Sequence, residues 1–144
     1  MALLCVSPLV AQNKLNGNAD NIVGTYVGKQ GPDRFRAQIV KLSDGTYRGQ
    51  VIWLEHDKDA NGKKILDANN PDKSLRSTPA DRIILFGGLK YNAKKHRWGD
   101  TKIYDPQRGV TANMTAEFVK DGRLKITGSV LLFRESVYWE KVEE

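Results

Sequence analysis

The chain has 144 residues, of which 40% are hydrophobic and 28% are charged, and its formal net charge is +6. This length fits one domain with a single core, and this balance is typical of a folded chain, not a disordered one. No apolar run reaches the roughly 18 residues that a membrane-spanning helix needs, so we expect no membrane span. Lys and Arg are spread along the chain instead of clustered, so we expect no nucleic-acid partner.

Residues 1–11, MALLCVSPLVA, are apolar and are followed by the polar Gln12. They resemble the second half of a secretory signal with a small residue at the cleavage point, although the positively charged start is missing. We therefore predict a truncated signal peptide at 1–11, a single domain at 12–144 and a periplasmic or secreted location. A cytosolic protein with an apolar N-terminus is the alternative. Cys5 lies in the segment that would be removed, which leaves the mature chain without disulfides or thiolate chemistry.

Alternation of apolar and polar residues is the main signal in the rest of the chain. Ala112, Met114, Ala116 and Phe118, for example, share one face of an extended segment. Gly, Pro, Asn and Asp separate such runs at short spacing, as in the turns of a meander. We predict strands near 22–28, 34–41, 46–54, 82–89, 96–104, 110–119, 123–132 and 136–142. The expected fold is all-β, a single antiparallel up-and-down β-barrel, because closure removes exposed strand edges.

One segment does not follow the alternation. Residues 55–81 are polar and are interrupted by Pro71 and Pro79. We predict a long ordered loop with about one helical turn, and loops of this length in compact domains are usually functional or disordered. The run Asp57–Gly62 resembles the first half of a calcium loop, but Ala68 stands where the bidentate Glu would be, so a solvated turn is the favoured interpretation.

The inward faces of the predicted strands give a candidate ligand site. The aromatic and aliphatic residues expected to line the barrel interior are Phe35, Ile39, Tyr47, Val51, Trp53, Met114, Phe118 and Ile126. An eight-stranded barrel is wide enough either to fill itself with side chains or to hold one small ligand. Small residues on the same faces, such as Ala37, Gly49 and Gly128, leave room and favour a cavity. A packed core stays an equal alternative.

Several short motifs follow one another in a specific order. They are Leu66–Asp72 with Leu75-Arg76, Gly87-Gly88-Leu89, Trp98, Lys102–Pro106 with Gly109, and Leu124–Gly128. Together they resemble the bacterial domain of unknown function 2147 family, over about Gly24 to Val142. The resemblance implies a small exported protein with a lipocalin-like barrel, and it supplies no activity. The family-motif positions in the two most specific runs are Asp67, Asn69, Asn70, Pro71, Asp72, Arg76, Lys102, Tyr104, Asp105 and Gly109.

Two interpretations of these motif residues stay open. Asn and Asp side chains cap their own backbone in turns, so the run Asn69–Asp72 is typical of a structural knot, with Arg76 pairing with Asp67 or Asp72. The other interpretation is a recognition surface at the barrel mouth. Lys102 and Tyr104 share one face of a strand, so we expect Tyr104 to pack and Lys102 to reach a carboxylate.

The chain departs from the family pattern in two places. Where the family tends to have Gly-x-Trp, this chain has Gly24-Thr25-Tyr26, so Tyr26 would plug the bottom of the barrel and its hydroxyl would need a partner. Where the family tends to end on Trp-x-Arg, this chain has Trp139-Glu140-Lys141. Lys141 or Arg134 would then replace the arginine.

The sequence contains no Gly-x-Ser-x-Gly elbow, no His-Glu-x-x-His pair and no phosphate-binding glycine loop. We therefore expect no enzyme, no cofactor and no metal site, with a catalytic carboxylate pair assembled only by folding as a weaker alternative. The leading hypothesis is a module that binds a small apolar or amphipathic ligand inside the barrel, with residues 55–81 as its rim or lid. The alternative is a structural or interaction protein of the cell envelope, with a filled barrel and a protein partner on that loop.

Overall fold

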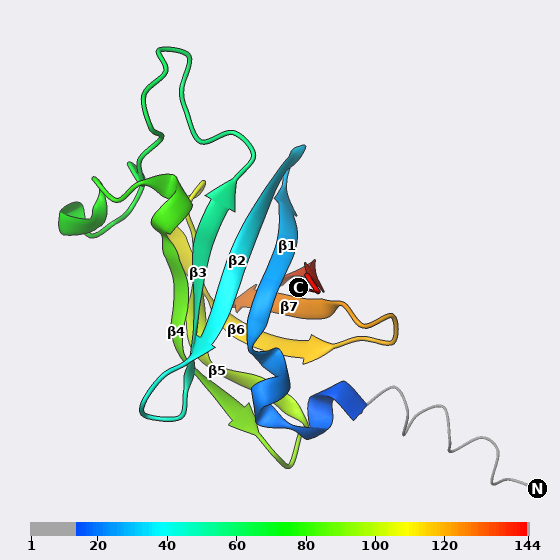
Figure 1. Ribbon diagram of the computed structural model, residues 1–144. Coiled ribbons are helices and arrows are strands. Elements are labelled where there is room, and N and C mark those ends of the chain that lie inside the picture. Colours follow the sequence, from blue (N-terminus) through cyan, green and yellow to red (C-terminus); the bar gives the residue numbers. More distant parts are fainter. Residues whose placement is uncertain (1–13, 144) are drawn as a thin grey trace, which may run out of the picture.

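The computed structural model describes residues 14–143, which form eight antiparallel strands that close into one barrel in sequence order (Figure 1). The strands are β1 (Gly24–Gln30), β2 (Asp33–Lys41), β3 (Tyr47–Leu54), β4 (Ile84–Asn92), β5 (Arg97–Asp105), β6 (Val110–Phe118), β7 (Leu124–Val130) and β8 (Phe133–Lys141). The predicted all-β, up-and-down barrel is therefore confirmed. The predicted signal segment, 1–11, lies outside the described residues.

In the described part of the chain, four short 3-10 helices accompany the strands: η2 (Lys14–Gly17), η3 (Ala19–Ile22), η4 (Lys73–Leu75) and η5 (Ala80–Arg82). The first two precede β1, and the other two lie between β3 and β4. Within residues 14–143, no helix has the length and apolar character needed to cross a membrane.

The lower end of the barrel, where η2, η3 and the β2–β3 and β4–β5 turns lie in Figure 1, is filled by side chains. The inward positions predicted from the alternation are buried here: Ile39, Tyr47, Val51, Met114, Phe118 and Ile126. The room expected at the small residue Gly49 is taken by the ring of Phe86, which a methyl group at Gly49 would strike. Small residues in this half therefore accommodate neighbouring rings, and they do not open a cavity.

Residues 14–22 close the lower end through paired polar groups. The buried Asn16 side chain donates to the Phe118 carbonyl (2.9 Å) and accepts the Phe118 N–H (2.7 Å), so it caps the end of β6. The Trp98 indole N–H reaches the Ala19 carbonyl at 3.1 Å. These bonds fasten the N-terminal turns to the barrel, a role that the strand pattern alone does not predict.

Two residues at the closure behave as the departures from the family pattern predict. The Tyr26 hydroxyl donates to the carbonyl of Ile22 at 2.8 Å, which gives the buried phenol its partner. The Lys141 ammonium donates to the Asn21 carbonyl at 2.8 Å and lies 6.0 Å from the centre of the Tyr26 ring. Lys141 therefore links the end of β8 to residues 21 and 26 at the closure.

The predicted inward position of Trp53 is wrong. Between Arg36 and Ala37 the β2–β3 register shifts, because Arg36 pairs with Trp53 while Ala37 pairs with Val51. The extra residue in β3, Ile52, is a bulge that turns Trp53 to the outer face. There its ring lies 5.7 Å from the Arg36 guanidinium and is 42% exposed.

The long loop, residues 55–83, extends from the upper end of the barrel, as predicted (Figure 1). It contains η4, η5 and two isolated bridges, Lys58 with Lys64 and Leu66 with Pro79. Its first part, 57–65, is an arm that projects beyond the barrel mouth, and its second part returns toward the wall. The loop therefore has its own internal hydrogen bonding between two anchored ends.

The turn of the last hairpin lies earlier in the chain than predicted. β7 and β8 pair in register from Leu124 with Trp139 to Val130 with Phe133, so the turn consists of Leu131 and Leu132. The predicted strand bounds place the turn at 133–135, and the observed turn contains no Gly, Asn, Asp or Pro.

Candidate functional site

A pocket of about 250 Å³ lies at the upper end, between the barrel mouth and the long loop. We call it the mouth pocket. Its apolar lining comes from the ends of β2 and β3 and from the returning part of the loop: Phe35, Leu54, Ile65, Leu66, Ala80 and Ile83. The up-and-down order places four connections at this end of the barrel, β1–β2, β3–β4, β5–β6 and β7–β8, and the longest of them, β3–β4, borders the pocket.

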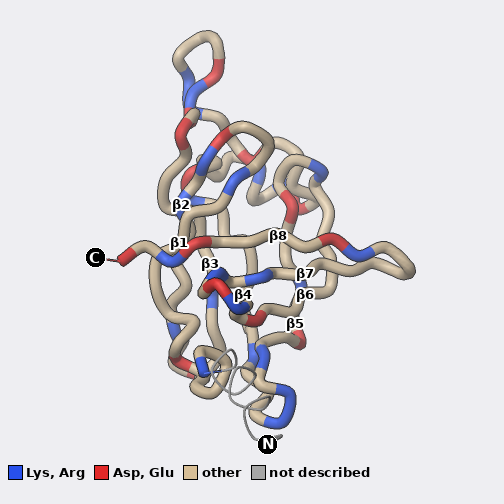
Figure 2. The backbone as a smooth tube through the Cα atoms, turned by 90° about the vertical axis from the view of Figure 1, so that its right-hand side faces the viewer, with Lys and Arg blue, Asp and Glu red and all other residues tan. Residues whose placement is uncertain are grey.

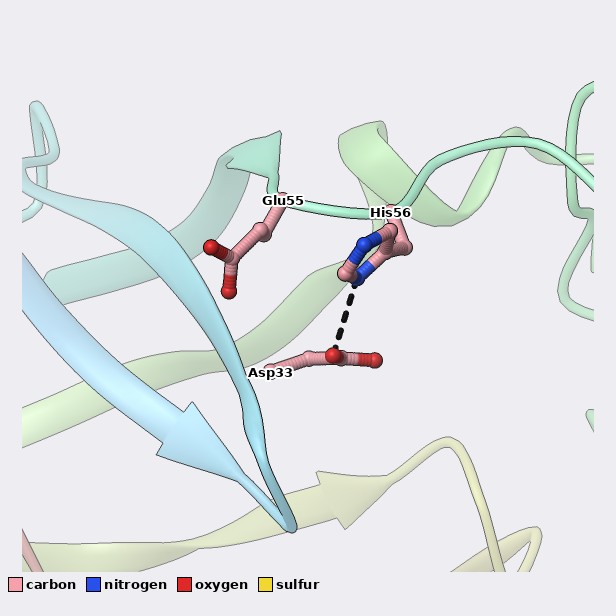
Figure 3. A group of neighbouring side chains, drawn as sticks. All are labelled: Asp33, Glu55 and His56. Atoms are coloured by element: carbon pink, nitrogen blue, oxygen red, sulfur yellow. Dashed lines mark hydrogen bonds and ion pairs between the residues drawn. The ribbon is translucent and has the colours of Figure 1, made fainter.

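Charged residues form the rim of the mouth pocket (Figure 3). Glu55 accepts the backbone N–H of Arg34 at 3.0 Å and its guanidinium at 3.1 Å. These two hydrogen bonds, with the Arg34 charge, lower the pKa of Glu55. His56 Nδ1 lies 2.9 Å from Asp33 Oδ1. The rim therefore holds two neighbouring polar pairs, both of which join the start of β2 to the end of β3.

The donor atoms of Asp33, Glu55 and His56 all lie within 4.8 Å of one another. Arg34 already neutralises Glu55, however, and Asp33 already occupies the Nδ1 of His56. A cation at this point would have to displace Arg34 or compete with it. The geometry supports a polar rim for the pocket better than a metal centre.

The motif run Asp67–Asp72 folds back on itself. The buried Asp67 accepts the Tyr104 hydroxyl at 2.8 Å through one carboxylate oxygen and the Asn70 amide at 2.8 Å through the other. Burial and this bond raise the pKa of Tyr104 to about 12. The hydroxyl of Tyr104 therefore ties the outer face of β5 to the loop.

A second contact joins the two most specific motif runs. The Asn69 amide donates to the carbonyls of Pro106 (3.2 Å) and Gln107 (3.0 Å) in the β5–β6 turn. Gly109 has a φ of 68°, and a side chain there would strike the Asn69 carbonyl. Only glycine fits both conditions, which is the physical reason for its place in the motif.

The remaining motif residues complete this structure, which we call the motif knot (residues 67–76 with 104–109). Asp72 caps η4 by accepting the Ser74 N–H and hydroxyl, and these bonds lower its pKa. The ion pair predicted for Arg76 is wrong, because its Nε donates to the Asn70 carbonyl at 2.6 Å. Lys102 is exposed, and among the described residues it makes no ion pair with a carboxylate. The contacts favour the structural interpretation of the motifs.

The calcium-like run also uses its oxygens internally. Asp59 Oδ1 accepts the N–H groups of Asn61 and Lys63, and Asp57 pairs with Lys64 at 2.9 Å. These bonds are those of a self-capped turn, in agreement with the favoured interpretation.

The structure brings only part of the predicted site together. Of the eight predicted interior residues, Phe35 lines the mouth pocket, while Trp53 lies outside and the other six belong to the packed core. Asp67 and Asn69 also line the mouth pocket. Sequence reasoning missed Asp33, Arg34, Glu55 and His56. Their signal was positional, since in a meander the β1–β2 turn and the end of β3 meet at one end of the barrel.

Comparisons with known proteins agree with the fold. A solved structure described as "Protein HP1028 from the human pathogen Helicobacter pylori belongs to the lipocalin family" matches with a TM-score of 0.68 at 18% identity, over 85% of this chain and 84% of that one. No curated protein sequence matches the chain. The family model described as "Uncharacterized protein conserved in bacteria (DUF2147)" matches residues 24–141. The chain therefore belongs to the DUF2147 family of bacterial proteins, with a lipocalin-like barrel.

Proposed function

We propose that this protein is an exported, non-catalytic carrier that binds a small amphipathic molecule in the mouth pocket. The observation that carries the proposal is the combination of an apolar lining and a charged rim in one hollow, above a barrel that is otherwise filled. Binding sites for small molecules typically combine an apolar wall with a few placed polar groups. The lipocalin-like fold is compatible with this role.

The size of the mouth pocket restricts the ligand. Its volume, about 250 Å³, equals the liquid volume of about eight water molecules. A ligand with a short hydrocarbon part fits, with its apolar end against Phe35 and Leu54 and its polar end at Arg34 and His56. Long acyl chains would have to leave the pocket, because Phe86 and the core rings fill the barrel below.

Native mass spectrometry tests the proposal on protein purified without detergent. We expect an added mass that disappears on denaturation and that is recovered chemically unchanged. A fatty-acid series of increasing length, followed by thermal shift, should show the best stabilisation at a short chain. An unliganded spectrum together with no thermal shift across the series would refute the carrier function, and recovery of a converted product would refute its non-catalytic part.

Two matched substitutions locate the site. Ala68 lines the mouth pocket and is exposed, so Ala68→Trp fills the pocket with little cost to the fold. Ala93, in the exposed β4–β5 turn at the other end, is the control. We expect Ala68→Trp to abolish the thermal shift and Ala93→Trp to retain it. Equal binding by both variants would place the ligand elsewhere.

Export is the second part of the proposal, and the apolar segment 1–11 before Gln12 supports it. Expression of the gene from an upstream start, with a C-terminal tag, followed by fractionation should place the protein in the periplasm or medium. Its N-terminus, read by mass spectrometry, is expected near Gln12. An intact N-terminus in the cytosolic fraction would contradict export without affecting ligand binding.

A filled lower barrel also favours a second candidate, an interaction protein of the cell envelope. The rings around Gly28 and Gly49 fill the interior of the barrel at these positions. This candidate predicts an unliganded protein whose stability does not respond to amphiphiles. The mass spectrum described above therefore separates the two.

A further inference from the structure

Strand β8 is paired along one edge and almost unpaired along the other. Seven residue pairs join it to β7, from Leu124 with Trp139 to Val130 with Phe133. On the other edge, the pairing with β1 consists of Tyr26 with Lys141 and Val27 with Glu140. Within the described residues, β8 therefore has a free edge from Phe133 to Trp139, where β1 and β8 diverge.

The free edge presents hydrogen-bonding groups at every second residue. The N–H of Val142 donates to the Thr25 carbonyl of β1 at 2.7 Å, so backbone groups at even-numbered positions point away from β7. Backbone direction alternates along a regular strand, and β7 and β8 pair without a bulge. The N–H and C=O groups of Arg134, Ser136 and Tyr138 therefore point outward from the free edge. All three residues are exposed.

The turn at the end of this strand is unlike the others in the chain. Leu131, Leu132 and Phe133 are 95%, 98% and 80% exposed, and the turn projects beyond the neighbouring strands (Figure 2). Leu131 also has a φ of 54°, a conformation that leucine rarely adopts. Four other turns place glycine at positive φ, at positions 31, 45, 109 and 122. The positive φ of Leu131 and the exposure of both leucine side chains to water are each unfavourable. Because these side chains are almost fully exposed, contacts within the described chain do little to offset that cost.

We propose that the free edge of β8 pairs antiparallel with β8 of a second copy of this chain, around a twofold axis at Ser136. An exposed edge strand with unpaired backbone groups is a ready template for another strand. Antiparallel pairing of a strand with itself uses the same residues on both copies, so it closes after two copies and leaves no further edge.

The charges along β8 exclude the neighbouring registers. A twofold axis perpendicular to the sheet leaves each side chain on the same face of the sheet in both copies. The axis must therefore lie midway between the two copies of one residue, which face each other. An axis at Arg134 places two arginines together, and an axis at Glu135 places two glutamates together. An axis at Val137 requires Glu140 and Lys141, which β1 already occupies.

An axis at Ser136 avoids these conflicts. It places Arg134 opposite Tyr138 of the second copy, and Glu135 opposite Val137 of the second copy. The three outward-facing residues of each strand then meet one another, which gives about six backbone hydrogen bonds across the axis. The leucine turns lie beyond the paired residues 134–138, at the two ends of the joint strand pair.

Cross-linking tests this register. In a chain that carries Cys5→Ser, Ser136→Cys places two thiols at the axis, where facing Cα atoms are about 5.5 Å apart and a disulfide forms. Thr127→Cys is the matched control, because Thr127 faces Ser136 from β7 and its two copies would be roughly 14 Å apart. We expect rapid oxidation to a covalent dimer for Ser136→Cys only. Equal cross-linking of both variants would overturn the register.

Sedimentation of the unmodified full chain tests the dimer itself. We expect a concentration-dependent monomer–dimer equilibrium, which Ser136→Lys weakens severalfold by placing like charges at the axis, while circular dichroism stays unchanged. A monomer at all concentrations would overturn the proposal. Flotation of that monomer with phosphatidylglycerol vesicles, lost in Leu132→Ser, would also overturn it and would assign the turn to a membrane.

Discussion

At the lower end of the barrel, residues 14–22 cover the core and pair their polar groups with β6 and Trp98, whereas the upper end holds an open pocket, charged rim pairs and a long loop. The β1–β8 pairing is also uneven, since within the described chain it exists at the C-terminal end of β8 and is absent toward the β7–β8 turn. The lower end therefore supplies stability. The upper end can vary its contacts with ligands and partners at less cost to the fold.

The largest contrast in the free energy of unfolding is expected between the removal of a buried tryptophan at the closed end and the removal of an exposed tryptophan on the barrel wall. Trp98 is fully buried, with its ring 5.0 Å from that of Tyr91 and 5.7 Å from that of Phe118. Trp98→Ala should lower the free energy of unfolding by about 3–5 kcal/mol in a urea titration. Trp53→Ala, on the exposed wall, should lower it by about 1 kcal/mol or less. Equal losses would mean that the wall stabilises the fold as much as the closed end does.

The second-largest contrast in the free energy of unfolding is expected between Asn16 and Asn69. The side chains of both asparagines hydrogen-bond to backbone groups at the end of a strand. Asn16→Ala leaves a buried N–H and a buried C=O of Phe118 without partners, so we expect a loss of about 3 kcal/mol. Asn69→Ala removes bonds to exposed carbonyls that water can reach, so about 1 kcal/mol is expected. Hydrogen exchange at the Phe118 amide should accelerate only in the first variant. Unchanged exchange there would show that the cap is dispensable.

The motif knot should contribute a moderate, pH-dependent amount. Tyr104→Phe removes the bond to Asp67 and should cost about 1–2 kcal/mol at neutral pH. Because the folded state raises the pKa of Tyr104 from 10 to about 12, its stabilisation is complete below pH 10 and is lost as the pH rises toward 12. The wild type should lose up to about 1.4 kcal/mol more per pH unit than the variant in this window. Tyr138→Phe, at an exposed site, should follow the wild type; parallel curves for all three would contradict the bond.

The smallest effect is expected at the rim. Arg34 lowers the pKa of Glu55, so ionised Glu55 stabilises the fold above its unfolded pKa, and this contribution disappears as the pH falls through the lowered value. Glu55→Gln should therefore cost less than any change above at neutral pH and nothing at acidic pH. Thermal melts across the acid range measure it, with Glu143→Gln as an exposed control. A difference that persists at low pH would mean that Glu55 acts through packing.

The alternation of apolar and polar residues predicted the strands because its cause is local: successive residues of a strand point to opposite faces of the sheet. It failed at Trp53, where one bulged residue reverses the faces without changing the sequence pattern. It also misjudged Gly49, because the ring that fills the space comes from Phe86 on another strand, and no local pattern identifies such a partner. The turn at Leu131 was missed because leucine is not a residue that usually forms such turns.

The motif knot shows how far a resemblance reaches. The two motif runs identified the family, but their contact through Asn69 joins residues separated by 37 positions. The rim pairs Asp33 with His56 and Arg34 with Glu55 belong to no motif and required the strand order to bring them together. The order of the strands in the barrel decides which distant polar side chains meet. Sequence reasoning therefore located the long loop but did not locate the pocket beneath it.

The arm at the top of Figure 1 has a practical use. Its ends are fastened to each other, since the Ile65 N–H donates to the Asp57 carbonyl at 2.9 Å and the Asp59 N–H to the Lys63 carbonyl at 2.8 Å. Foreign sequence spliced between Ala60 and Asn61 would therefore begin and end at adjacent points in space, where domain insertion succeeds best. The arm is the position at which a reporter peptide or a fluorescent domain can be carried by this barrel without disturbing its pocket.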